Sequence, residues 1–170
     1  MNSATHIHLK RNPTPLVRSS NRRQIEVTNT PENNKATVRE FYDLAFNQRK
    51  PAEAVAKHVG NYYRQHNPGA ADGSEAFVEF VSAFTDAYPG LTVEFKRFVG
   101  EDDVVAVHSN FVREPNDRGL AVMDLFRLED GKVVEHWDTI QEVLKTAANA
   151  NTMFQRRRTR TRRRRQSPPT

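Results

Sequence analysis

Three ionisable residues near the end of the chain have the types and spacing that acid–base chemistry requires. Asp124 lies on one strand-like segment, and His136 and Asp138 lie two residues apart on the next. A carboxylate in an apolar pocket can have its pKa raised until it works as a base or an acid near neutral pH. A histidine held by a second carboxylate has a fixed tautomer and can donate a hydrogen bond to a substrate oxygen. Together such groups could remove a proton beside a carbonyl group and stabilise the enolate that results.

The turn between the two segments decides which side chains share a face. If residues 130–131 form a two-residue turn, His136 lies opposite Leu125. If residues 129–131 form a three-residue turn, His136 lies opposite Asp124, at roughly 5 Å between Cβ atoms, and a hydrogen bond is feasible. We favour the three-residue turn. It gives one face the mixture of apolar and ionisable side chains expected of a pocket wall: Val122, Asp124, Phe126, Val134, His136 and Asp138.

Two other interpretations of His136 and Asp138 stay open at this point. They could form an ordinary ion pair at a strand end, because structural pairs also place ionisable groups on sheets. Their spacing also fits part of an iron site with two histidines and one carboxylate, but no histidine follows His136. His66 or His108 could complete such a site only by an accident of the fold. We expect neither a metal nor a cofactor.

The elements that must position these residues are helices first and strands afterwards. Thr30 and Pro31 have the character of a helix start, a capping hydroxyl followed by proline at the first helical position. Apolar spacing predicts helices over residues 31–47, over 51–58, and from Ser74 to the break at Pro89. Runs rich in Val, Phe and Leu predict strands over residues 91–99, 104–112, 120–128 and 132–140. This order predicts an α+β fold in which about three N-terminal helices pack on a curved antiparallel sheet and enclose a pocket.

Composition narrows the class of protein. The chain has 170 residues and no cysteine, which suits one domain and excludes disulfides and cysteine nucleophiles. No apolar run is long enough to span a membrane and no signal-like stretch is present, so we expect a cytoplasmic protein with no membrane partner. Residues 31–154 hold 13 Lys/Arg and 20 Asp/Glu, a net charge of −7, although the whole chain carries +5.

Both ends of the chain are basic. We expect residues 1–30 to be a disordered basic leader; the alternative, suggested by its acid-poor and Arg-containing composition, is an organelle transit peptide. Residues 155–170 contain eight arginines and should form a disordered Arg-rich tail. Such a tail could bind nucleic acid, but it lacks interleaved aromatic residues, so we do not expect a nucleic-acid partner apart from it.

Residues 124–138 (DLFRLEDGKVVEHWD) resemble the closing hairpin of SnoaL-like polyketide cyclases, which belong to the nuclear-transport-factor-like superfamily of cone-shaped α+β folds. Residues 37–55 (TVREFYDLAFNQRKPAEAV), 62–73 (YYRQHNPGAADG) and 148–154 (ANANTMF) resemble the same group. The resemblance covers residues 31–154. It implies homodimers formed through the sheet and ring closure by intramolecular aldol condensation without metal or cofactor.

The resemblance also assigns roles to the hairpin residues. The family's catalytic carboxylate lies in a His-x-Asp element, which implies that Asp138 is the acid/base and His136 its neighbour in the pocket. Asp124 stands where the characterised cyclases have a histidine, and we take it as substrate-binding. We expect a cofactor-independent enzyme acting on a small apolar or carbonyl-containing molecule, of the aldol-condensation (cyclase) or isomerase type. The alternative is a non-catalytic ligand-binding or dimeric scaffold module on the same fold.

Two further histidines are candidates for substrate binding. His66 precedes the third predicted helix and could bind a substrate oxygen at the pocket mouth; alternatively, His66 and Asn67 only hold the turn. His108 lies on a predicted strand, where it could face the pocket or be a satisfied core histidine.

Overall fold

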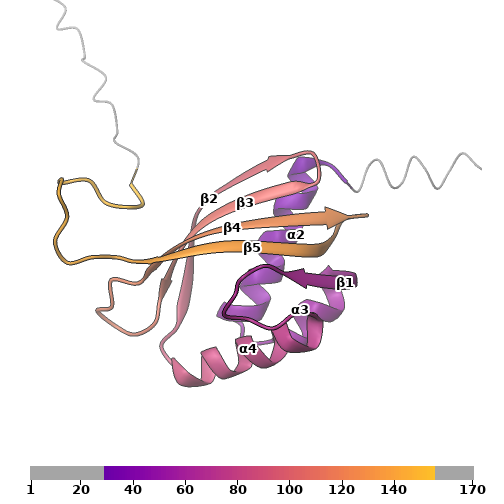
Figure 1. Cartoon of the computed structure of the whole chain (residues 1–170), viewed down its shortest axis with the longest axis horizontal. Coiled ribbons are helices and arrows are strands. Elements are labelled where there is room, and N and C mark those ends of the chain that lie inside the picture. Colours follow the sequence, from indigo (N-terminus) through magenta and orange to yellow (C-terminus); the bar gives the residue numbers. More distant parts are fainter. Residues whose placement is uncertain (1–28, 156–170) are drawn as a thin grey trace, which may run out of the picture.

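The computed structural model describes residues 29–155, a layer of helices packed on one sheet (Figure 1). The predicted disordered leader (residues 1–30) and Arg-rich tail (155–170) lie outside the described residues, except for residues 29, 30 and 155. The helices are α2 (Pro31–Tyr42), its π-helical continuation η1 (Asp43–Asn47), α3 (Pro51–His58) and α4 (Ser74–Ala87). The strands are β1 (Val59–Gln65), β2 (Thr92–Glu101), β3 (Val104–Val112), β4 (Leu120–Glu129) and β5 (Lys132–Glu142).

The helices begin and end close to where the sequence predicts. Thr30 caps α2, because its hydroxyl accepts a hydrogen bond from the backbone N–H of Asn33 at 3.2 Å, and Pro31 occupies the first turn. The predicted helix over 31–47 is α2 together with η1, and α3 covers the predicted residues 51–58. No helix among residues 29–155 is long and apolar enough to cross a membrane.

The sheet has the strand order β1-β5-β4-β3-β2. Strands β2 to β5 form the predicted antiparallel meander. The sequence did not predict β1, which pairs parallel to β5 and makes the sheet mixed. Only one residue of this edge strand, Tyr63, is buried, and the polar and aromatic side chains of residues 59–65 lack the alternation that marks a half-buried strand. The missing strand matters, because its end carries Gln65 into the site.

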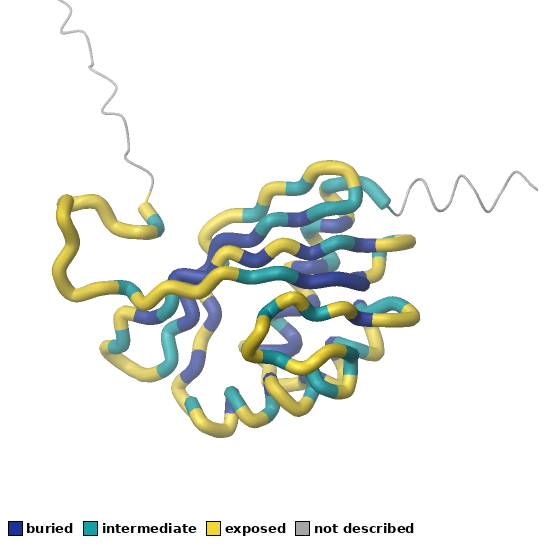
Figure 2. The backbone as a smooth tube through the Cα atoms, in the orientation of Figure 1, coloured by how far each residue is buried: buried dark blue, intermediate teal, exposed yellow. Residues whose placement is uncertain are grey.

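The core lies between the helices and one face of the sheet, and Figure 2 shows the buried backbone concentrated along the central strands. Val38 and Phe41 of α2 are fully buried against this face, as are Val105, Val107 and Phe126. None of the helices within residues 29–155 lies over the opposite, outer face of the sheet. This arrangement gives the hairpin β4–β5 one face toward the helices and one face away from them.

The hairpin register differs from both predicted alternatives. Asp130 and Gly131 form a two-residue turn in which both have positive φ (49° and 73°), as a type I′ turn requires. A β-bulge follows at once, since Leu128 pairs with Val133 but Arg127 pairs with Glu135. The extra residue shifts β5 by one position, and His136 lies opposite Phe126.

The preferred three-residue turn is therefore wrong, yet the predicted partition of side chains between faces holds for the ionisable residues. A two-residue turn alone would have placed Asp124 and His136 on opposite faces, and the extra residue of the bulge returns them to the same face. Asp124 pairs directly with Asp138, and Leu125 pairs with Trp137 on the other face. Gly60 makes room for the bulge, because a Cβ at this position would lie 2.8 Å from the Val134 side chain.

Candidate active site

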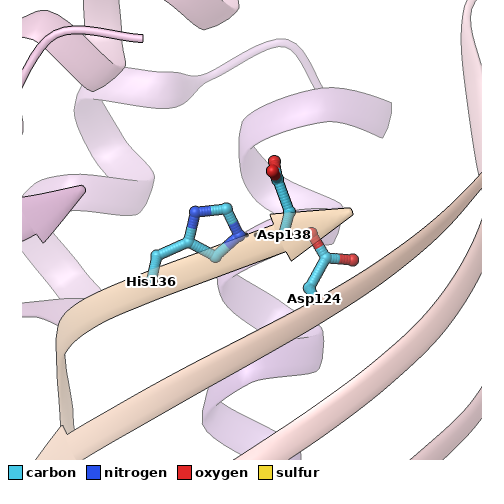
Figure 3. Close-up of side chains that lie close together, drawn as sticks. All are labelled: Asp124, His136 and Asp138. Carbon is cyan, nitrogen blue, oxygen red and sulfur yellow. Dashed lines mark hydrogen bonds and ion pairs between the residues drawn. The ribbon is translucent and has the colours of Figure 1, made fainter. Parts of the chain in front are cut away.

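The hairpin brings the three predicted residues together (Figure 3). Asp124 on β4 and Asp138 on β5 are direct partners across the ladder, and His136 lies two residues before Asp138 on the same face. Nε2 of His136 is 3.2 Å from Oδ1 of Asp124. The predicted Asp124–His136 hydrogen bond is thus present, but it runs diagonally rather than between opposed residues.

A tyrosine from the helical layer completes a buried triangle with this pair. The hydroxyl of Tyr42, at the end of α2, donates to Oδ1 of Asp124 at 2.9 Å and lies 3.1 Å from Nε2 of His136. All three side chains are nearly inaccessible to solvent, with exposed fractions of 1–3 %. The His136 ring stacks on Phe126, with 4.7 Å between the ring centroids, so the imidazole cannot easily turn away from Asp124.

Burial dominates the electrostatics of the triangle. It raises the pKa of Asp124 above its ordinary value, and the hydrogen bonds from His136 and Tyr42 oppose that rise without cancelling it. Oδ2 of Asp124 has no hydrogen-bond partner among the described residues, so ionisation would leave negative charge on a buried oxygen that no donor stabilises. Burial and the neighbouring Asp124 also raise the pKa of Tyr42, which therefore stays a hydrogen-bond donor.

Asp138 has a different environment from Asp124. It is partly exposed, and both of its oxygens accept from the side-chain amide of Asn67, at 2.8 and 2.9 Å. The carbonyl oxygen of that amide accepts from the backbone N–H of Gly69 at 2.7 Å, which fixes the orientation of Asn67. One amide group holds this carboxylate in place and leaves lone pairs of both oxygens available to a ligand.

These polar groups open into a mostly apolar pocket between α4 and the sheet. The volume open to the centre of a water-sized sphere inside the pocket is about 90 Å³. Its polar lining comes from Tyr42, Gln65, Asn67, Asp124, His136 and Asp138. Its apolar lining comes largely from five phenylalanines: Phe46, Phe77, Phe80, Phe84 and Phe111.

The other two predicted site residues do not line this pocket. His66 stacks on Trp137 with 4.6 Å between ring centroids, and its Nε2 lies 2.9 Å from Oε1 of Glu135. His108 lies 2.8 Å from the guanidinium of Arg97, through Nδ1, and packs against Phe154. Both histidines are thus occupied elsewhere, and we no longer assign either to substrate binding.

The ionisable cluster does not have the character of a metal site. Asp124, His136 and Asp138 offer ligand atoms within 4.8 Å of one another, close enough to consider a shared cation. However, Nε2 of His136 and Oδ1 of Asp124 contact each other and Tyr42. A cation bound between Nε2 of His136 and Oδ1 of Asp124 would have to displace these contacts, and we therefore derive no chemical step through one.

Sequence reasoning missed three residues of the pocket. Tyr42 reads only as an apolar position on α2, and nothing in its spacing distinguishes it from a core aromatic. Asn67 is adjacent to the histidine that seemed the better candidate, and the Asn67-Pro68-Gly69 break was the available signal, because loop residues near a pocket often carry function. Gln65 could not be placed without the unpredicted strand β1.

The match to a family model settles the relationship to known proteins. Residues 38–136, more than half of the chain, match the SnoaL-like domain. This chain belongs to the SnoaL-like family. The match ends at His136, so it includes Tyr42 and Asp124 and stops two residues before Asp138. No protein with a curated description matches the sequence.

Solved structures agree with the SnoaL-like fold. AclR, a proposed hydroxylase from Streptomyces galilaeus, is 24% identical, with a TM-score of 0.55 over 66% of this chain and 91% of AclR. A proposed polyketide cyclase from Bacillus cereus ATCC 10987 is 19% identical, with a TM-score of 0.55 over 64% and 74%. A proposed ketosteroid isomerase from Kribbella flavida is 21% identical, with a TM-score of 0.56 over 74% and 90%. Within residues 29–155 the sheet does not close, and helices α2, α3 and α4 cover one face of it in a cone-like fold.

Proposed function

We propose that this SnoaL-like protein is a cofactor-independent enzyme that removes a proton beside the carbonyl group of a small, largely apolar substrate. The observation that carries the proposal is the pairing of two unlike carboxylates across one ladder. Asp138 is partly exposed to the pocket, whereas its direct partner Asp124 is buried with a raised pKa. Two carboxyl groups in contrasting environments are suited to opposite roles in proton transfer.

In the proposed reaction, the Asp138 carboxylate takes the proton from the carbon next to the carbonyl. Asn67 positions Asp138 by holding both of its oxygens. The electron pair of the broken C–H bond moves toward the carbonyl oxygen and forms an enolate. The enolate then either attacks a second carbonyl carbon, as in an aldol cyclisation, or regains a proton at another carbon, as in an isomerisation.

The triangle of Tyr42, Asp124 and His136 is the proposed source of hydrogen bonds to the developing oxygen anion. Its groups are already ordered and largely shielded from water, so little reorganisation is needed when charge develops. The names isomerase and cyclase among the structural relatives fit this first step, because both kinds of reaction can begin with removal of such a proton.

A direct test uses 2-tetralone, an aromatic ketone with acidic C–H groups beside its carbonyl, as the probe. The protein in D₂O should accelerate exchange of these hydrogens, as followed by ¹H NMR. Asp138→Asn should reduce the exchange rate by about 100-fold or more, since general base catalysis is worth roughly 10²–10⁴-fold. Probe binding, measured by ligand-induced shifts in the protein spectrum, should persist in the variant.

The outcomes separate an enzyme from a binding module. Exchange that is fast in the wild type and lost in Asp138→Asn supports the proposed chemistry. Probe binding without exchange in either protein would favour the alternative, a ligand-binding module on the same fold. Exchange that continues at the wild-type rate in Asp138→Asn would show that Asp138 is not the base.

We also propose that the protein forms a homodimer through the outer face of the sheet. Met123 and Leu125 on β4 are 47 % and 43 % exposed there, and Trp137 lies opposite Leu125 on β5. Apolar side chains grouped on an open sheet face are suited to cover the same face of a second copy.

Light scattering after size-exclusion chromatography tests the dimer. The chain has a mass of 19.5 kDa, so a dimer should elute with about twice that mass. Leu125→Glu should shift the protein toward the monomer by burying a charge at the interface. Ala83→Glu, at an exposed position of α4 in the helical layer on the other side of the sheet, is the control and should leave the mass unchanged. A wild-type protein that remains a monomer at high concentration would rule out this interface.

A further inference from the structure

The side chain of Gln65 lines the pocket and contacts two groups through one atom. Its side-chain oxygen, Oε1, accepts from the backbone N–H of Asn67 at 2.9 Å and lies 3.1 Å from Nδ1 of His136. The residue is the last of β1, next to β5, where it pairs with His136. Two groups from different elements therefore meet at one amide oxygen.

The contact with Asn67 identifies the Gln65 atom chemically. A backbone N–H can only donate, so the atom it meets must be the carbonyl oxygen and not the amide nitrogen. The loop is itself held in place, because the backbone N–H of Gln65 donates to Asp72 at 2.7 Å and that of His66 donates to the carbonyl of His136 at 2.9 Å. Rotation of the Gln65 amide by half a turn would place its NH₂ group against the Asn67 N–H.

A fixed oxygen at Gln65 determines the proton position on the imidazole. An amide oxygen accepts only, so Nδ1 of His136 must carry the proton in this contact. The other nitrogen, Nε2, faces Oδ1 of Asp124 at 3.2 Å and the Tyr42 hydroxyl at 3.1 Å. Nε2 is then the one ring nitrogen that can gain or lose a proton while the Gln65 contact is kept.

The proton count of the triangle follows from these contacts. Tyr42 has one hydroxyl proton, and it is donated to Oδ1 of Asp124. The remaining contact, between Nε2 and the same oxygen, needs a proton of its own, because two lone pairs would otherwise face each other in a buried site. That proton resides either on Asp124 or on His136, and both alternatives keep Nδ1 protonated.

We propose that Gln65 is a positioning residue that keeps the proton of His136 on Nδ1 and thereby confines the transferable proton to the contact between Nε2 and Asp124. This inference rests on the proposed function for its catalytic meaning. There, the confined proton is the one that the site can share with a substrate oxygen while Asp138 acts as the base. The arrangement of protons itself is a property of the free protein.

The experiment is NMR of the ring nitrogens in the full-length, ¹⁵N-labelled chain without substrate at pH 7. The chain has six histidines, and His136→Gln assigns the His136 signals by their loss. We expect Nδ1 of His136 to give the signal of a protonated ring nitrogen. A wild-type protein in which Nδ1 is unprotonated and Nε2 carries the only ring proton would overturn the proposal.

Variants distinguish this role from simple packing. Gln65→Leu removes the acceptor, so the population with Nδ1 protonated should fall at least about fivefold relative to the Nε2-protonated form. Gln65→Glu retains an oxygen acceptor and should restore the wild-type pattern at Nδ1. Gln141→Leu, the same change at an exposed position of β5, is the matched control and should leave the His136 signals unchanged.

The outcomes also separate this inference from the proposed reaction. His136 signals in Gln65→Leu that match the wild type, in a variant whose amide spectrum shows it folded, would overturn the role of Gln65. Absence of 2-tetralone exchange together with the expected ring signals would instead refute the proposed reaction and leave the positioning role intact.

Discussion

The two faces of the hairpin carry the same kinds of groups in opposite electrostatic settings. On the pocket face, His136 contacts the carboxylate of Asp124, and a tyrosine hydroxyl is the nearest other partner. On the outer face, His66 contacts the carboxylate of Glu135, and the Arg127 guanidinium donates to it at 2.8 Å. Glu135 and His136 are consecutive residues, so a step of one position along β5 separates the two settings.

The difference shows that hydrogen-bond partners outweigh burial at one carboxylate, whereas burial outweighs the partners at the other. Both carboxylates are buried, with exposed fractions of 1 % for Asp124 and 8 % for Glu135. Hydrogen bonds from His66 and Arg127 lower the pKa of Glu135, whereas burial raises the pKa of Asp124, which has no arginine partner. The outer pair is therefore suited to structure, and the pocket pair to proton transfer.

The largest expected effect is on the rate of 2-tetralone exchange, where substitutions on the two faces of the hairpin should differ most. Asp138→Asn should lower the 2-tetralone exchange rate by about 100-fold, equivalent to roughly 2.7 kcal/mol. Glu135→Gln makes the same chemical change on the outer face and should alter the rate by less than about twofold. Equal losses in the two variants, measured by NMR at saturating probe, would contradict the division of roles.

The next effect concerns stability of the outer face. Arg127→Leu removes the guanidinium from the Glu135 carboxylate and should cost about 1–2 kcal/mol at pH 7. A carboxylate whose pKa is lower in the folded state stabilises the fold at any pH above its unfolded-state pKa. This contribution disappears as the pH falls through the folded-state pKa. The loss measured by urea unfolding should therefore shrink in acid. Arg118→Leu, at an exposed position, is the control and should cost little at either pH.

A smaller effect has the opposite dependence on pH. The pKa of Asp124 is raised in the folded state, so its contribution to stability is present below the unfolded-state pKa and is lost as the pH rises through the folded-state value. Asp124→Asn, which cannot ionise, should therefore gain stability relative to the wild type as the pH rises from the unfolded-state pKa of Asp, about 3.9, through the folded-state pKa. We expect a relative change of about 5 °C in Tm, measured by thermal unfolding. A relative change in the other direction would contradict the raised pKa.

The smallest effect is expected at the outer histidine. His66→Gln should cost less than about 0.5 kcal/mol, because the His66 side chain is 37 % exposed and Arg127 remains on Glu135. His136→Gln is the matching change in the pocket. It should cost more, since His136 is 3 % exposed and its partner Asp124 would be left in a buried site. Urea unfolding of both variants at pH 7 gives the comparison.

The sequence predicts most of the elements because their signals are local. The cap at Thr30, the apolar spacing of α2 and α4, the Val-rich run of β3 and the Leu-containing run of β4 all lie within single segments. It could not predict β1, whose strand character comes from pairing with β5 and not from its own pattern. The grouping of His136 and Asp138 on one face followed from their alternation on one strand, and their role in catalysis stays a prediction.

The parts of the site that the sequence could not predict depend on contacts between distant segments. Tyr42 reaches Asp124 across 82 positions, and Asn67 reaches Asp138 across 71. His66 and Asn67 are neighbours in a loop, and only the folded loop determines which of them turns toward the pocket. The hairpin register failed for a related reason, because turn chemistry identifies residues 130–131 but does not reveal a bulge two residues later.

The extra residue at Val134 also governs how this hairpin should be compared among relatives. A hairpin of the same turn length without that residue would form a regular ladder in which Arg127 still pairs with Glu135 and Phe126 with His136, so the same side chains would face the pocket. A hairpin that kept the residue but not the bulge would shift β5 by one position, placing Glu135 toward the helices and His136 away from them. When homologous sequences are aligned, a single-residue gap here should therefore be read as loss of the bulge, with the pocket face preserved.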